Sequence, residues 1–269
     1  MNAGHIRIVR YAIKIGYDGS HFNGFAMQPD KKTVEGEILK RLLKTGIIKS
    51  RRESGFQYAA RTDKGVHAFG NVIALNAKAN PVKVLSEMEN IWCMGYATVK
   101  EGFNPRHAKA KIYRYYLIND GYDIKEMKKA AKLFEGRHDC SSFSRRDARN
   151  PIREIYSVRL HAGKIIKIDF LAPSFLWNQV RRMVAAIIAI GMEKASIESI
   201  KRALNGERMN FGIAKAGNLV LLDVVYESLS FEKIIPDEIF LRREIYKDAL
   251  DYIMNATHSR NVGLTKPVE

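Results

Sequence analysis

The residue with the clearest chemical potential is Asp63, an acidic side chain between the cations Arg61 and Lys64 in the segment 60–68, ARTDKGVHA. An aspartate is ionised at neutral pH unless burial prevents it, so it can act as a nucleophile or as a base. On this local pattern alone, the commoner case is an ordinary hairpin turn whose aspartate caps its own backbone. The segments around Asp63 are therefore needed to distinguish a reactive carboxylate from an ordinary turn residue.

The elements next to Asp63 favour a rigidly held side chain. Residues 62–65, TDKG, have the composition of a tight turn, with Gly65 placed late, where a positive φ is often needed. Residues 66–75 are apolar on both alternating faces, which predicts a strand buried on both sides. We therefore expect Asp63 at the end of a central strand, a position suited to holding a reactive side chain still.

Five further segments accompany this turn in a fixed order along the chain. They are 15–25, IGYDGSHFNGF; 111–115, KIYRY; 133–143, LFEGRHDCSSF; 175–183, FLWNQVRRM; and 214–221, AKAGNLVL. Together with RTDKGVHA at 61–68 and GNV at 70–72, they resemble the motifs of the TruA family of tRNA pseudouridine synthases. One such motif is a weak signal, whereas several in family order between about residues 12 and 226 are a strong one.

Three positions depart from the family pattern. Ala60 stands where many members have glycine, Ala26 where a glutamine is usual, and Lys215 where the family has proline. These departures leave open a multisite pseudouridine synthase that acts on other tRNA positions or other RNAs.

The resemblance implies roles for three side chains. Asp63 matches the catalytic carboxylate, Tyr113 the tyrosine that stacks on the target uracil, and Arg181 an arginine that pairs with Asp63. Arg61 is placed either to fill the vacancy left by an everted base or to contact phosphate. Whether Asp63 attacks the ribose or the base, or instead removes the 2′ proton, stays open. His67 receives no catalytic role and is expected to be a hydrogen-bonded structural residue.

Tyr113 and Arg181 also have ordinary structural interpretations. A tyrosine on an amphipathic strand is usually part of the core, although its ring equally offers a stacking platform for a flipped uracil and its hydroxyl an acceptor for the C5 proton. Arg181 lies at the edge of an apolar helical stripe, where solvated arginines are common and from which a side chain also reaches a cleft. The resemblance favours the functional interpretation of both.

The family's reaction needs no cofactor. It breaks the N1–C1′ bond of a uridine and rejoins the base through C5, which is a redox-neutral isomerisation without nicotinamide, ATP or metal. The sequence agrees, since it contains no Walker loop, no G-x-G-x-x-G fingerprint and no convincing His/Cys metal cluster. The implied target is the anticodon stem-loop of tRNA, nominally uridines 38 to 40, and the implied assembly is a homodimer.

Composition favours a polyanionic partner. The 269 residues have a formal net charge of +16, and the sequence pI is near 9.8. A solvated, lysine-rich surface of the kind found in thermophile proteins is the alternative explanation. Basic clusters at 49–52, 125–129 and 145–153 are candidate contacts to an RNA backbone, although each alone is more typical of a solvated face.

Several features predict a soluble cytoplasmic protein. Cys93 and Cys140 are the only cysteines, and two free thiols in a reducing cytosol is the simplest interpretation. The N-terminus lacks the layout of a signal peptide. The longest apolar run, 183–190, is far shorter than the about 20 residues that span a bilayer.

The pattern of elements predicts an α+β fold. Strands are expected at 6–15, 66–75, 111–118, 164–172 and 219–225, and helices at 34–46, 82–92, 123–134, 174–188, 196–205 and 236–254. The resemblance implies two similar halves, 1–107 and 108–269, that form one continuous, mostly antiparallel sheet with flanking helices and a central cleft. Asp63 belongs to the first half, and Tyr113 and Arg181 belong to the second.

A non-catalytic RNA-binding protein or chaperone on the same scaffold is the alternative from a different class. Net charge and aromatic residues suit it equally well. The combination of Asp63, Tyr113 and Arg181 argues against it, because a pure binder gains little from a carboxylate that faces phosphates.

Overall fold

One large sheet organises the chain. The computed structural model describes residues 8–145 and 149–234. The strands of the sheet are β1 (Val9–Tyr17), β2 (Gln57–Tyr58), β3 (His67–Ala77), β4 (Ile91–Thr98), β5 (Ala110–Ile118), β8 (Ser157–His161), β9 (Ile165–Ala172), β10 (Leu219–Val225) and β11 (Glu232–Lys233). Their order is β11-β4-β1-β3-β10-β5-β9-β8, with β2 paired to β3 beside this row. A separate pair consists of β6 (Gly136–Asp139) and β7 (Ile152–Ile155).

Strand β10 comes late in the chain but lies in the middle of the sheet, between β3 and β5. It pairs in parallel with β3, where Val220 faces His67, and antiparallel with β5, where Leu221 faces Tyr113. The other strand pairs among the described residues are antiparallel, so the predicted continuous and mostly antiparallel α+β sheet is confirmed. Gly70 permits the close approach of β3 and β10, because a Cβ atom there would lie 2.4 Å from the carbonyl oxygen of Leu222.

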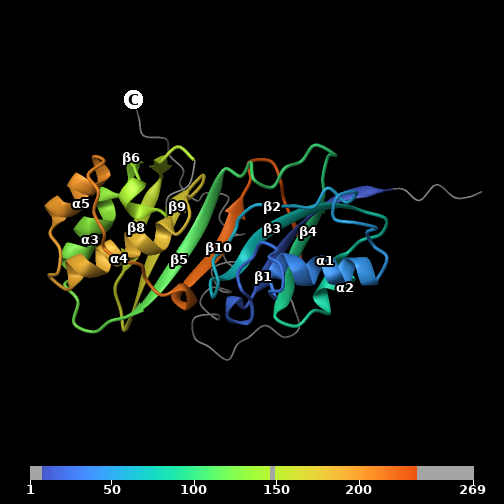
Figure 1. Cartoon of the computed structure of the whole chain (residues 1–269), viewed down its shortest axis with the longest axis horizontal. Helices are drawn as coiled ribbons and strands as arrows, with labels where there is room; N and C mark the ends of the chain where they lie inside the picture. Colours follow the sequence, from blue (N-terminus) through green and yellow to red (C-terminus); the bar gives the residue numbers. More distant parts are fainter. Residues whose placement is uncertain (1–7, 146–148, 235–269) are drawn as a thin grey trace, which may run out of the picture.

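Helices flank the sheet at both ends. They are α1 (Val34–Lys44), α2 (Val82–Ser86), α3 (Ile124–Leu133), α4 (Gln179–Gly191) and α5 (Ile197–Leu204). Figure 1 shows α1 and α2 beside β1 to β4 at one end, and α3, α4 and α5 beside β8 and β9 at the other, with β5 and β10 between them. Within the sheet, β3 pairs with β1 and β10, and β5 pairs with β10 and β9, so neither strand lies at an edge.

Local sequence explains where three of these helices begin. Thr33 accepts a hydrogen bond from the backbone N–H of Gly36, Asp123 one from Glu126, and Ser196 one from Ser199. Each bond satisfies a donor that the first helical turn leaves without a partner. The expected starts of α1, α3 and α5 are confirmed, as is the strand expected at 219–225.

Two expected helices were wrong in extent. The helix expected over 82–92 ends at Ser86, and Trp92 belongs to strand β4 instead. The left-handed φ of 61° at Asn90 turns the chain, and Trp92 then stacks on Phe69 across the sheet with 6.3 Å between the ring centroids. Helix α4 begins at Gln179 rather than near residue 174, because Asn178 has a φ of 63°.

The remaining expectations concern the termini and the division of the chain. The strand expected at 6–15 begins at Val9 within the described residues and continues to Tyr17, and residues 6 and 7 lie outside the described residues. The helix expected over 236–254 lies outside the described residues. The division at residue 107 stays a prediction. In the described part of the chain, no helix has the length and apolar character needed to cross a membrane.

Candidate active site

Asp63 lies in a tight turn immediately before the buried strand β3. The backbone N–H of Val66 donates to the carbonyl oxygen of Asp63 at 3.1 Å, and Gly65 has the positive φ of 83° that the sequence indicated. This is the geometry in which glycine is favoured over residues with a side chain. The residues of β3 are buried almost throughout, so the turn is attached to a rigid element.

Both carboxylate oxygens of Asp63 receive hydrogen bonds from helix α4 or the loop before it. Nη1 of Arg181 donates to Oδ2 at 3.1 Å, and the indole Nε1 of Trp177 donates to Oδ1 at 3.0 Å. The sequence predicts the first partner, Arg181, but not the second, Trp177. Trp177 stood inside the segment 175–183, but an indole N–H is a single donor whose target only the fold specifies.

Arg181 is itself held in place by the segment before β10. Its Nε donates to the carbonyl oxygen of Ala214 at 2.8 Å, and the backbone N–H of Ala214 donates to the carbonyl oxygen of Arg181 at 3.1 Å. The guanidinium therefore bridges two partners and is not a solvated side chain at the helix edge. A planar group with fixed donors is suited to such a bridge.

Tyr113 lies on β5 at the floor of the same site. Its ring meets Phe175 edge to face, with 5.3 Å between centroids, and the residue is 8% exposed. Burial, with smaller contributions from Tyr17 and Asp63, raises the pKa of the Tyr113 phenol far above its ordinary value. The hydroxyl is therefore protonated at neutral pH.

An open cleft with a volume of about 50 Å³ connects these residues. It is lined by Arg61, Thr62, Asp63, Val66, Tyr113, Phe175, Leu176, Trp177, Asn178, Gln179, Val180, Arg181 and Leu219. The lining combines one carboxylate, two guanidiniums and several aromatic rings. This composition suits a planar, polar group such as a nucleobase more than an apolar ligand.

Arg61 reaches the cleft without joining the Asp63 ion pair. Its side chain is exposed, and within the described ranges it forms no ion pair or hydrogen bond. Of the two arginines that the sequence placed near Asp63, only Arg181 contacts the carboxylate. Arg61 is thus free to contact a ligand.

The segment that leads to Asp63 is anchored along its length by buried polar side chains. The amide of Asn71 accepts from the N–H of Ala60 and donates to its carbonyl, at 3.2 and 3.0 Å. The hydroxyl of Tyr17 lies 2.8 Å from that of Thr62. These contacts restrict the backbone on which Asp63 depends, as expected for a site that must be rigid.

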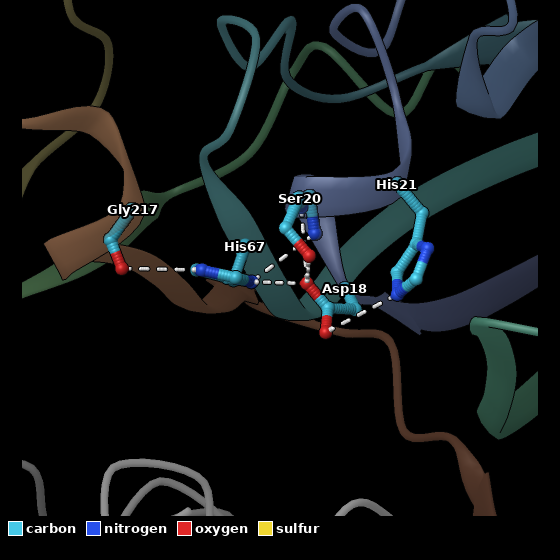
Figure 2. Close-up of polar contacts among 6 residues, drawn as sticks. Asp18, Ser20, His21, His67 and Gly217 are labelled. Carbon is cyan, nitrogen blue, oxygen red and sulfur yellow. Dashed lines mark hydrogen bonds and ion pairs between the residues drawn. The ribbon is translucent and has the colours of Figure 1, made fainter.

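A second polar cluster, outside the cleft lining, contains Asp18, Ser20, His67 and Gly217 (Figure 2). Nδ1 of His67 is 3.1 Å from Oδ1 of Asp18, and its Nε2 is 3.2 Å from the carbonyl oxygen of Gly217. Asp18 also accepts from the N–H and hydroxyl of Ser20, at 3.0 and 2.6 Å. His67 is absent from the cleft lining, and its contacts join β3 to the segment before β10. This geometry fits the structural role expected from the sequence.

Of the three basic clusters expected to contact RNA, the one at 145–153 has a described residue beside the cleft. In the cluster at 145–153, the guanidinium of Arg145 stacks over the ring of Trp177 at 4.1 Å, beside the cleft. Arg51 pairs with Glu35 at 2.8 Å, and Lys129 with Glu126 at 2.6 Å. Across 8–145 and 149–234, no group of three or more His, Cys, Asp or Glu side chains is arranged to hold a metal ion.

Comparison with known proteins adds an independent finding. A family profile described as tRNA pseudouridine synthase matches residues 130–227. A relative from Thermococcus sibiricus, "tRNA pseudouridine synthase A", is 44% identical over 234 residues, which are 83% of this chain and 87% of that protein. The protein of the same name from Pyrococcus abyssi is 40% identical over 232 residues, with the same shares of the two chains.

A solved structure described as "Crystal Structure of a Cbf5-Nop10-Gar1 Complex" is similar at a lower level. The match has a TM-score of 0.30 and 14% identity, and it covers 66% of this chain and 54% of that chain. A likeness this low supports no argument about the site.

Proposed function

We propose that this chain, which belongs to the tRNA pseudouridine synthase family, isomerises uridines of the anticodon stem-loop of tRNA, nominally positions 38 to 40, with Asp63 as its catalytic carboxylate. The chain is an isomerase of that family. The position of the target uridines and the roles of individual side chains are the proposal.

The observation that supports Asp63 is its place in the cleft. It is the carboxylate of the lining, and Arg181 and Trp177 each donate to one of its oxygens. Such bonds fix the direction of the carboxylate. An aimed carboxylate serves either version of the chemistry, attack on the ribose or base, or removal of the 2′ proton.

Tyr113 and Arg61 complete the proposed substrate site. The Tyr113 ring provides a surface on which an extruded uracil stacks, an interaction of about 1–3 kcal/mol per base. Arg61, exposed at the cleft, either fills the gap that the uracil leaves or contacts a phosphate. Extrusion from a stem costs a few kcal/mol, which favours target positions in or beside a loop.

The reaction has a readout that does not depend on binding. When the N1–C1′ bond breaks and the C5–C1′ bond forms, C5 loses its hydrogen to solvent. We therefore expect wild-type protein to release tritium from unmodified tRNA labelled at C5 of uridine, and Asp63→Ala to release none while it keeps most of its tRNA affinity. Asp63→Asn, nearly equal in shape to the wild type, is the matched variant for the loss of charge alone.

Three outcomes would each overturn a part of this proposal. Tight, salt-sensitive binding without tritium release from any tRNA would favour a non-catalytic RNA-binding protein. Release that persists after uridines 38, 39 and 40 are each replaced by cytidine would place the targets elsewhere, as in a multisite enzyme. Release by Asp63→Ala at the wild-type rate would remove the catalytic role of Asp63.

The proposed setting is a cytoplasmic homodimer. The free cysteines Cys93 and Cys140 are both buried, which suits a reducing compartment. Sedimentation equilibrium of the full chain tests the dimer, since the monomer mass is 30.6 kDa. A single species of that mass at micromolar concentration would contradict it.

A further inference from the structure

We propose that Lys111 and Arg106 form a binding site for one phosphodiester of the bound tRNA, next to the cleft that contains Asp63. The inference rests on the proposed function, because the phosphate belongs to the RNA that presents its uridine to that cleft. It assigns a ligand to the ammonium group of Lys111, which is buried and does not line the cleft that contains Asp63.

The first observation is the burial of a charged group with a neutral partner. Lys111 is 9% exposed, and its Nζ donates to the carbonyl oxygen of Ala59 at 2.7 Å. Among the described residues this is the hydrogen-bond partner of Nζ, and no carboxylate lies within the 4.0 Å of an ion pair. An ammonium has three donors, so two of them have no protein partner among the described residues.

The second observation is that the neighbouring charges that shift the pKa of Lys111, among the described residues, have the same sign as its ammonium. Burial first, and then the charges of Arg106 and Arg149, lower the pKa of Lys111 to about 8. A buried ammonium beside other cations is unfavourable in the free protein, and buried charges are normally paired. An anion that enters this position reverses the repulsion, because it attracts all the cations around it.

The third observation is how Arg106 is presented. Its exposed guanidinium lies over the ring of Tyr58, 5.4 Å from the centroid, and Tyr58 directly precedes Ala59. The aromatic face supports the side chain without using its N–H donors. A flat guanidinium with open donors beside a lysine is a common arrangement for phosphate binding.

The position of the site relative to the catalytic residues is the fourth observation. Lys111 precedes Tyr113 by two residues on β5, so the two side chains share a face and lie about 7 Å apart along the strand. Ala59 precedes Asp63 by four residues on the anchored segment. A phosphate held here therefore lies within a nucleotide or so of the uracil that stacks on Tyr113.

Lys111 has a simpler interpretation, namely that it only ties the carbonyl of Ala59 to β5. A neutral donor would be enough for that purpose, and it would avoid the repulsion from Arg106 and Arg149. The two interpretations predict different salt dependences, because only a phosphate contact displaces counter-ions from RNA.

The test is tRNA binding measured over a range of KCl concentrations. The variants are Lys111→Met, which keeps the length of the side chain and removes its charge, and Lys201→Met, a matched control. Lys201 is half exposed and pairs with Glu198 on α5, so the control has the same change in net charge. Arg106→Gln tests the second member of the site.

We expect Lys111→Met to make the slope of log K against log[KCl] shallower by about 1 and to weaken binding about eightfold at about 0.1 M KCl. Arg106→Gln gives a similar change, and Lys201→Met leaves the slope unchanged. An affinity loss at constant slope would overturn the proposal in favour of the structural tie. An unchanged affinity and slope would overturn it as well.

A second measurement uses the wild-type protein and so does not depend on the folding of a variant. With a pKa of about 8, part of the Lys111 population is neutral at pH 8.5, and a phosphate ligand draws a proton onto it. Calorimetry of tRNA binding at pH 8.5 in two buffers of different ionisation enthalpy should therefore detect net proton uptake. Absence of uptake contradicts the proposal.

Failure of this inference is distinguishable from failure of the proposed function. If wild type releases tritium from tRNA and Asp63→Ala does not, the catalytic assignment stands whatever Lys111→Met does to the salt slope. If Lys111→Met alters the slope while no protein releases tritium, the phosphate site stands on a binding protein.

Discussion

Asp63 and Arg181 are 118 positions apart in the chain, yet Oδ2 of Asp63 lies 3.1 Å from Nη1 of Arg181. The same guanidinium donates through Nε to Ala214, in the segment that leads into β10. One side chain therefore connects the turn before β3, the first turn of α4 and the approach to β10. The direction of the Asp63 carboxylate depends on how all three are arranged.

Arg181→Lys should reduce turnover far more than it reduces tRNA binding. An ammonium does not present two donors in the fixed geometry that reaches both Asp63 and Ala214. Since a misplacement of about 1 Å can cost about 100-fold in rate, we expect a fall of that order in kcat, with KM changed less than threefold. The measurement is tritium release under multiple-turnover conditions.

Arg202→Lys is the matched control for that substitution. Arg202 pairs with Glu207 on the surface, remote from the cleft lining. We expect it to leave both kinetic parameters as they are. An Arg181→Lys enzyme with wild-type kcat would mean that the bridge between Asp63 and Ala214 is not required for the chemistry.

Trp177→Phe tests the second donor to Asp63. The substitution removes the bond from Nε1 to Oδ1 and keeps an aromatic ring beneath Arg145. A hydrogen bond to a charged group contributes about 1.5–3 kcal/mol, so we expect kcat to fall by at least about tenfold. Single-turnover rates at saturating enzyme isolate this step from binding. An unchanged or higher rate would indicate that Trp177 competes with the substrate for Asp63.

The sequence predicted those parts of the site that depend on short, contiguous segments of the chain. Asp63, Gly65 and the buried strand after them follow from turn composition and apolar alternation, and the structure contains all three. The pairing of Asp63 with Arg181 was expected from resemblance alone. Local physics does not specify a partner 118 residues away, because it depends on sheet order.

The wrong predictions of helices and strands also arise from contacts that the local sequence does not specify. The apolar spacing at 82–92 suited a helix, but Ile91 and Trp92 gain more from pairing with β1 and packing across the sheet. Tertiary contacts override propensity at such places. The short polar strands β6 and β7 escaped notice, because segments such as GRHD at 136–139 have no apolar period to detect.

Substitutions of Tyr113 separate the ring from the hydroxyl. Tyr113→Phe keeps the edge-to-face contact with Phe175 and the stacking surface, so we expect tRNA affinity and KM within twofold of wild type. Tyr113→Ala removes about 1–3 kcal/mol of stacking, and we expect KM to rise about tenfold. Steady-state tritium release for both variants gives the comparison. Equal losses in the two variants would show that the hydroxyl, not the ring, is the functional group.

The cluster of Asp18 and His67 predicts how the fold responds to acid. Burial alone raises the pKa of Asp18, but hydrogen bonds from His67 and Ser20, with the attraction of His67, outweigh it and hold this pKa well below its usual range. A carboxylate whose pKa is lowered by folding contributes stability above its unfolded pKa of about 3.9, and that contribution disappears as the pH falls towards the folded value. The free energy of unfolding should therefore decrease steeply below about pH 4.

Asp18→Asn isolates this contribution. Because it removes a charged acceptor from the N–H and hydroxyl of Ser20, and a negative charge beside His67, we expect the free energy of unfolding at pH 7 to fall by about 1–3 kcal/mol. Its decline below pH 4 should become shallower than in wild type. Urea unfolding from pH 7 to pH 3 measures both quantities. Glu207→Gln, which breaks an exposed ion pair with Arg202, should change the curve much less. A wild-type slope for Asp18→Asn between pH 4 and pH 3 would show that other carboxylates control the acid response. The cluster of Asp18 and His67 would then hold β3 to the segment that contains Gly217 without a net electrostatic contribution.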